Sequence, residues 1–241
     1  MYYGVEAGNG QGILMGMDVG RISPTRGFET AEFEARCAKA QALMAVADIS
    51  AILLTTEPEI RYFSGFLTPF WQSPTRPWFM VVPATGKPVA VIPEIGRDCM
   101  TATWIDDIRT WSSPDPEDDG VSLLMEALRD AVGDGSAFGV AMGPETHLRM
   151  PLLDFEMLTR TLALDIADAT PILRQLRMVK SEAEIDKIAH ICGIVSGVFE
   201  GMPGWLAAGM TEVEVFRRFR IEALQAGADD VPYLVGGAGP G

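Results

Sequence analysis

The chain has 241 residues, of which 48% are hydrophobic and 22% are charged, a balance that is ordinary for a globular protein with a buried core. Its formal net charge of −14 at pH 7 disfavours a nucleic-acid partner or an anionic membrane surface, because both require clustered Lys and Arg. No stretch approaches the roughly 20 apolar residues that a membrane helix needs, so we expect a soluble cytoplasmic protein.

The first 26 residues differ from the rest of the chain in amino-acid composition. They are rich in Met and Gly, they lack the basic region of a signal peptide, and glycines interrupt their apolar run. We interpret residues 1–26 as a poorly packed leader and a candidate for disorder. Further along, Cys37, Cys99 and Cys192 are widely spaced and form no CxxC pattern, so we expect each to lie reduced in a core.

From residue 27 to residue 170, short strand-like runs alternate with helical patterns. Thr30–Ala47 has apolar residues at helical spacing, residues 52–54 form a short buried run, and ATGKP separates two apolar runs as in a β-hairpin. The same patterns predict strands at 105–111, 138–142 and 164–166 and helices at 121–132 and 152–162. This alternation indicates an α/β domain with a mixed sheet, in which the hairpin supplies the antiparallel part.

From residue 171 to residue 241 the pattern is nearly all helical. Ser181 and Thr211 each begin a capping box, with a Glu three residues later, and each box precedes a predicted helix. The run Val231–Val235 predicts a strand, followed by the glycine-rich stretch GGAGPG. Two helices and one strand cannot close a sheet of their own, so we interpret this region as a domain cut short.

Three further sequence patterns give only weak indications of a functional site. GGAGPG lacks the Lys and the following helix of a phosphate-binding loop. Glu182, Asp186 and His190 lie four residues apart on one predicted helix face and could hold a transition metal, but such a pattern more often marks a solvated face. A Ser-His-Asp triad is not supported, because Ser64 is not in a GxSxG elbow and His147 lies in a loop-like stretch.

The stretch FLTPFWQSPTRPWFMVV places an arginine among aromatic residues. Trp71 and Arg76 lie in or just after a Pro-containing turn, near Phe70, Trp78 and Phe79. A guanidinium flanked by aromatic faces can bind a carboxylate through two parallel hydrogen bonds in a partly dry site. The alternative is a hairpin lip whose aromatic residues pack in the core while Arg76 points to water.

Several motifs occur in a characteristic order: EPEIRYFSGF, the aromatic stretch with its arginine, the hairpin VVPATGKPVAVIP and, further along, LRQLRMVKSEAEIDKIAH. Together they resemble the creatinase/aminopeptidase P/prolidase family, over about residues 30–241. The resemblance implies a creatinase-type N-terminal domain at 27–170, with a mixed sheet flanked by helices. It also implies that residues 171–241 are the N-terminal part of a truncated α+β "pita-bread" metallohydrolase domain.

The resemblance further implies an activity and a cofactor. Family members hydrolyse an amide-like C–N bond, often next to proline, and the peptidases use two divalent ions, commonly Mn²⁺, Co²⁺ or Zn²⁺, to activate water. The family's metal ligands and its catalytic histidine have no counterpart here, so no catalytic or metal residue is implied in this chain. We expect the intact protein to be an Xaa-Pro peptidase-like metallohydrolase of the aminopeptidase P or prolidase type, and this chain alone to be inactive.

In creatinase-like members, an arginine of the N-terminal domain reaches the neighbouring subunit's active site and binds the substrate carboxylate. Arg76 lies where that arginine would fall, between YFSGF and WFMVV, and Trp71 is a looser match to an aromatic wall of the same site. The resemblance thus implies Arg76 and Trp71 as substrate-binding residues, a proline-containing peptide or small carboxylate as substrate, and a homodimer. Two alternatives stay open: a creatinase-like hydrolase or lyase acting on a small zwitterion, and a non-catalytic binding or dimerisation module.

Overall fold

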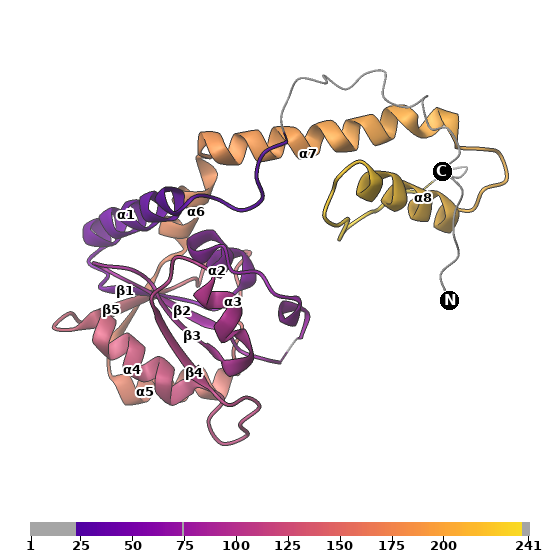
Figure 1. Cartoon of the computed structure of the whole chain (residues 1–241). Coiled ribbons are helices and arrows are strands. Elements are labelled where there is room, and N and C mark those ends of the chain that lie inside the picture. The colour runs from indigo at the N-terminus through magenta and orange to yellow at the C-terminus, as the bar shows by residue number, and fades with distance from the viewer. Residues whose placement is uncertain (1–22, 74, 238–241) are drawn as a thin grey trace. The chain divides into compact units, whose positions relative to one another are not determined.

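The computed structural model describes residues 23–73 and 75–237 (Figure 1). Its contacts divide the described residues into two compact units: one is Gly27–Val179, and the other contains residues 180–237 together with residues 23–26. Most of the predicted leader, residues 1–22, lies outside the described residues. Within the described part of the chain, no helix combines the length and the apolar character that crossing a membrane requires.

A six-stranded mixed sheet organises residues 27–179, with the strand order β4-β3-β2-β1-β5-β6. The pairs β1–β2 and β2–β3 are antiparallel, whereas β1–β5, β3–β4 and β5–β6 are parallel. The predicted mixed sheet is therefore confirmed, and β2, the first strand of the predicted hairpin, runs antiparallel to both of its neighbours, β1 and β3. The strands are β1 (Ala51–Leu54), β2 (Phe79–Pro83), β3 (Val89–Pro93), β4 (Asp107–Trp111), β5 (Ala137–Val140) and β6 (Asp165–Asp168).

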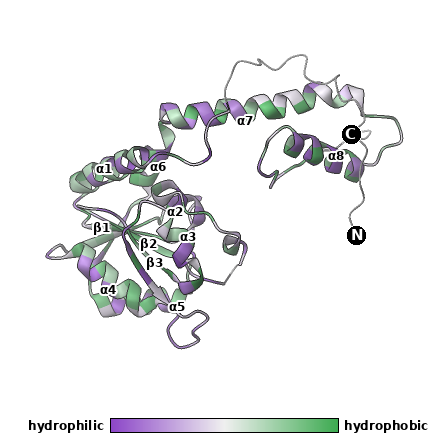
Figure 2. Cartoon of the chain, viewed as in Figure 1, coloured by the Kyte–Doolittle hydropathy of each residue, from purple (hydrophilic) through white to green (hydrophobic). Residues whose placement is uncertain are grey.

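Helices cover both faces of this sheet. Ile52 and Leu54 of β1 belong to the core shared with α1, α2 and α6, whereas Ala51 and Leu53 belong to the core shared with α4 and α5. The result is a three-layer α/β/α unit (Figure 1), in which α1 and α4 carry both hydrophobic and hydrophilic residues (Figure 2). The helices are α1 (Thr30–Ala47), α2 (Glu57–Ser64), α3 (Arg97–Thr101), α4 (Val121–Val132), α5 (Leu152–Leu162) and α6 (Thr170–Met178).

The predicted long helices are confirmed with the expected bounds, as α1, α4 and α5. Helix α2, inside EPEIRYFSGF, was not predicted, because its eight residues are too few to give a distinctive period. Helix α6 packs Ile172, Leu173 and Leu176 into the core of the first unit. This unit consequently continues to Val179, beyond the predicted boundary at 170.

The second unit contains two helices, α7 (Glu182–Gly201) and α8 (Glu212–Gln225), with a 3-10 turn, η3 (Met202–Gly204), after the first. Both predicted capping boxes are confirmed: Ser181 Oγ accepts from the Glu184 amide at 3.2 Å, and Thr211 Oγ1 accepts from the Glu214 amide at 3.3 Å. Each Glu carboxylate accepts in return from the amide of its N-cap residue. The two helices meet at a small core of Ile194, Val198, Phe219, Ala223 and Ala228.

The predicted strand Val231–Val235 is wrong, since residues 231–235 have no regular secondary structure. A strand needs a neighbouring backbone to satisfy its amides and carbonyls, and the described residues of this unit contain no strand to pair with. Tyr233 and Val235 are 80% and 68% exposed, while Val231 and Leu234 pack against the small core. Of GGAGPG, residues 238–241 lie outside the described residues.

The three cysteines are free, but the prediction that each lies in a core is wrong for two of them. Cys37 is buried on α1, and burial raises the pKa of its thiol to about 11. Cys99 is exposed because α3 is a five-residue helix that buries Met100 and turns its other residues outward. Cys192 is exposed beside Ile188 and Ile191, because the small core of this unit covers only part of the apolar stripe of α7.

We expect iodoacetamide to alkylate Cys99 roughly 100-fold faster than Cys37 at pH 8, because the thiolate is the reactive form and a raised pKa lowers its fraction. Mass spectrometry of samples quenched at increasing times would measure both rates. Denaturant serves as the control, since unfolding should bring Cys37 to the rate of Cys99. Equal rates in the folded protein would contradict the burial of Cys37.

Candidate functional site

The segment between α2 and β2 rests on three buried aromatic rings. A 3-10 turn, η1 (Pro69–Gln72), carries Trp71, whose ring packs against Phe66 and Trp78 at centroid distances of 6.3 and 5.6 Å. Trp71 is 9% exposed and Trp78 is fully buried, so both rings belong to the core. Their indole Nε1 atoms have no hydrogen-bond partner among the described residues. Little of the Trp71 ring is left for a ligand to contact.

Arg76 lies just ahead of β2, with a half-buried side chain. Its guanidinium forms no ion pair or hydrogen bond with the residues at 23–73 and 75–237. A half-buried cation without an acidic neighbour has lost part of its hydration and gained no protein partner in return. The arrangement therefore favours an external anion at this position.

Arg149, in the loop before α5, binds the segment that carries Arg76. Its Nη1 donates to the carbonyl oxygen of Arg76 at 2.6 Å, and its Nη2 donates to the carbonyl oxygen of Ser73. Its guanidinium also lies over the ring of Trp71, 5.1 Å from the centroid. We call Trp71, Ser73, Arg76 and Arg149 the arginine lip.

The charge of Arg149 is poorly compensated by neighbouring acids. Burial lowers the pKa of its guanidinium, and the negative charge of Glu57 counteracts part of that shift. The direct partners of the guanidinium are neutral carbonyls and an aromatic ring. Since an arginine stays protonated at neutral pH, the arginine lip carries two positive charges. This local excess contrasts with the net charge of −14 over the whole chain.

Sequence reasoning missed Arg149. It lies in the loop-like stretch PETHLRM, two residues after His147, which is exposed. Arg149 contacts Arg76 across a separation of 73 residues and Ser73 across a separation of 76 residues. No local sequence pattern encodes contacts between residues so far apart. The remaining sequence signal is an isolated arginine in a turn, which is normally solvated.

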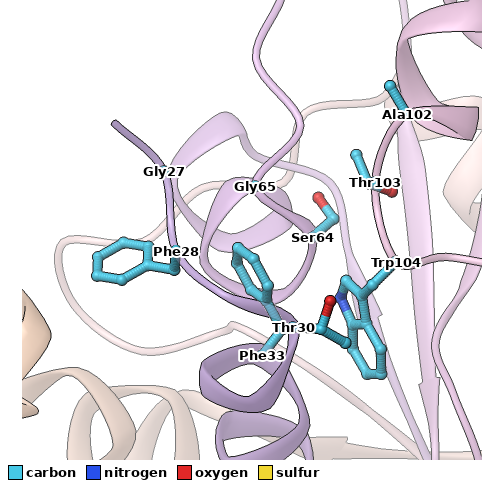
Figure 3. Close-up of a pocket in the computed structure, with 9 residues that line it drawn as sticks. All are labelled: Gly27, Phe28, Thr30, Phe33, Ser64, Gly65, Ala102, Thr103 and Trp104. Carbon is cyan, nitrogen blue, oxygen red and sulfur yellow. The ribbon is translucent and has the colours of Figure 1, made fainter. Parts of the chain in front are cut away.

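A hollow of about 270 Å³ on the same unit is a second candidate (Figure 3). The rings of Phe33 and Trp104 stack on its wall, with centroids 6.4 Å apart. The hydroxyls of Ser64 and Thr103 and the indole of Trp104 each donate to a main-chain carbonyl at 2.7 Å. Its described lining includes no charged side chain, so it lacks the groups that would fix a carboxylate or a metal. The lining residues are Gly27, Phe28, Thr30, Phe33, Ser64, Gly65, Ala102, Thr103 and Trp104.

The weaker sequence patterns do not assemble into a site. Glu182, Asp186 and His190 lie on α7, where the two acids are exposed and His190 is half-buried. Among the described residues, no group of three or more His, Cys, Asp or Glu side chains could hold a metal ion. The described residues therefore do not fit the two divalent ions that the family resemblance implies.

A model of the Creatinase/Prolidase N-terminal domain matches residues 36–179, which are most of the first compact unit. The chain belongs to the creatinase/prolidase N-terminal domain family. The match contains the whole arginine lip and the whole six-stranded sheet. It confirms both the family resemblance and the creatinase-type fold inferred from the sequence.

Relatives are known by sequence and by structure. The chain is 26% identical over 216 residues to a Mycobacterium tuberculosis protein named "Probable dipeptidase PepE", covering 90% of this chain and 55% of that one. Dipeptidase PepE from Mycobacterium ulcerans has a similar structure, with a TM-score of 0.67 and 27% identity over 86% of this chain and 53% of that one. The prolidase from Pyrococcus horikoshii shares the fold, with a TM-score of 0.61 and 18% identity over 81% of this chain and 50% of that one. The chain thus spans about half the length of these relatives.

Because Trp71 is buried, we expect truncation of its side chain to lower the stability of the fold. We expect Trp71→Ala to lower the free energy of unfolding by about 3–5 kcal/mol, the usual range for truncating a buried aromatic ring. The matched control is Phe70→Ala on the same turn, where the ring is 40% exposed and the loss should stay near 1 kcal/mol. Urea titration followed by far-UV circular dichroism measures both. Equal losses would contradict the placement of Trp71 in the core.

Proposed function

We propose that the intact protein is an Xaa-Pro peptidase-like hydrolase that cleaves an amide C–N bond, and that residues 27–179 form its substrate-recognising N-terminal domain. The family match supports the hydrolase class, and the names of the relatives, a dipeptidase and a prolidase, support peptides as substrates. The observation that carries the recognition role is the half-buried Arg76, whose guanidinium has no partner among the described residues.

In this proposal Arg76 binds the carboxylate of the substrate. Guanidinium and carboxylate match in shape, so two parallel N–H···O bonds form at once and fix the orientation of the ligand. The partial burial of Arg76 strengthens such a pair, because fewer water molecules compete for the charges. A dipeptide ending in proline carries its carboxylate next to the bond to be cleaved, so holding that group also positions the bond.

The predicted role of Trp71 as an aromatic wall stays a prediction of lesser weight. Its ring is 9% exposed, and the Arg149 guanidinium lies over it. We propose that Trp71 acts mainly as a platform beneath the arginine lip. A substrate ring would then meet the edge of Trp71 rather than its face.

Metal chemistry lies outside what the described residues can supply. We propose that two divalent ions, Mn²⁺, Co²⁺ or Zn²⁺, serve the intact protein, with their ligands beyond the residues described. This chain alone is then inactive, and its contribution is binding and orientation. A cytoplasmic location and a homodimer in which Arg76 serves the neighbouring subunit are further parts of the same proposal.

A creatinase-like reaction on a small zwitterion is the competing proposal. The same observation on Arg76 favours it, because creatine-like molecules also present a carboxylate. Hydrolysis assays with an Xaa-Pro dipeptide and with creatine in parallel separate the two, since each proposal expects turnover of only one.

We expect Arg76→Ala in the intact enzyme to raise KM for an Xaa-Pro dipeptide by about 10- to 100-fold, since a charge-assisted hydrogen bond contributes about 1.5–3 kcal/mol. Steady-state kinetics measure this, and a substrate with an amidated C-terminus should show a much smaller change. Arg61→Ala is the matched control, because Arg61 on α2 is exposed and its nearest acid, Glu57, is 3.9 Å away. An unchanged KM in Arg76→Ala would remove Arg76 from the binding site.

A further inference from the structure

We propose that Arg149 is a positioning residue, which holds the main chain at Ser73 and at Arg76 and so sets the direction of the Arg76 guanidinium. The inference rests on the proposed function of Arg76 as the carboxylate ligand. It adds a residue 73 positions away in the chain, which would act on the substrate only through Arg76.

The first support is that the contacts of Arg149 converge on one short segment. Its two terminal nitrogens donate to the carbonyls of Ser73 and Arg76, and its guanidinium carbon lies over the Trp71 ring, 5.1 Å from the centroid. A planar guanidinium can make two divergent hydrogen bonds and one cation–π contact together, which the single ammonium of a lysine cannot reproduce. The guanidinium thus holds the main chain at Ser73 and Arg76 against the buried Trp71 ring.

The second support is that Arg149 is itself anchored to the centre of the sheet. Its amide donates to Thr55 Oγ1 at 3.0 Å, and Thr55 is 2% exposed. Thr55 directly follows β1, which pairs with β2 on one side and β5 on the other. The chain of contacts therefore runs from β1 through Thr55 and Arg149 to the backbone of Arg76.

The third support is that Arg149 supplies the side-chain hydrogen bonds to the main chain at Ser73 and Arg76. Between η1 and β2, the Ser73 amide donates to the Phe70 carbonyl at 3.0 Å, which closes the 3-10 turn. No other side chain among the described residues donates a hydrogen bond to the carbonyl of Ser73 or of Arg76. Loss of the two Arg149 donors would free this stretch to take several conformations, each aiming Arg76 differently.

The test is a cycle of variants in the intact enzyme, assayed with an Xaa-Pro dipeptide. Arg149→Lys keeps the charge and removes the fork, so we expect KM to rise about tenfold with kcat within about twofold of the parent. In an Arg76→Ala background the same change should have little further effect on KM, because the residue that Arg149 positions is gone. Arg160→Lys on α5 is the matched control, since the Arg160 side chain is 80% exposed, and it should leave KM unchanged.

Amide exchange gives a second readout. We expect the Ser73 amide to exchange faster in Arg149→Lys than in the parent, while amides of β1 keep their protection. If Arg149→Lys does not fold, Arg149→Gln, which retains one donor group, takes its place in the cycle. Thermal unfolding of each variant separates a local loss of order from a global loss of stability.

The kinetic results distinguish a failure of the positioning role of Arg149 from a failure of the proposed function. An unchanged KM in Arg149→Lys, with a raised KM in Arg76→Ala, overturns the positioning role and leaves the proposed function standing. An unchanged KM in Arg76→Ala overturns the proposed function, and the inference falls with it. Fully additive effects of the two variants, or a fall in kcat that matches the loss of stability, would show that Arg149 acts structurally and not through Arg76.

Discussion

The burial of β1 on both of its faces constrains the whole of residues 27–179. All four of its residues are buried, with alternate side chains in two cores. A strand in that position cannot slip by one residue without exchanging its two sets of side chains between cores, so its register is fixed. The residues that directly follow it, Thr55 and the first turn of α2, inherit that fixed position. The arginine lip depends on it through the hydrogen bond between Thr55 and Arg149.

The arginine lip combines a rigid base with positive charge on an acidic chain. The rigid base comes from the packed rings of Phe66, Trp71 and Trp78, and the charge comes from Arg76 and Arg149. The many carboxylates elsewhere in the chain contribute solubility, whereas a local cationic patch selects for anions at one place. The terminal nitrogens of Arg149 already donate to backbone carbonyls. Arg76 is therefore the arginine of the lip whose N–H groups are available to donate hydrogen bonds to a ligand.

Most of the fold was predictable because it depends on short-range patterns. The apolar stripe of α1, the hairpin β2–β3 and the capping boxes at Ser181 and Thr211 each fit within one helix or one turn, so local chemistry determines them. The failures depend on partners distant in the chain. Residues 231–235 have strand-like composition but no strand to pair with among the described residues of their unit, and Cys192 lies on an apolar stripe that the small core leaves partly uncovered.

The residues of the candidate site also differ in how far they could be predicted from local sequence. Arg76 and Trp71 are five residues apart, so their short spacing and the family resemblance suffice to predict that they act together. Arg149 lies in a different loop, and only the parallel pairing of β1 with β5 brings that loop beside the segment before β2. The burial of Trp71 was one of two alternatives that the sequence left open, and the choice between them depends on how Trp78 and Phe66 pack against its ring.

The outer strands of the sheet bear on how two copies could associate. Strands β4 and β6 are the two outermost strands, and their exposed acidic residues are Asp107 on β4 and Asp165 and Asp168 on β6. Charged residues on an outermost strand oppose the docking of another strand, because the pairing would bring like charges together or strip them of water. These charges therefore oppose extension of the six-stranded sheet by an added strand at either edge.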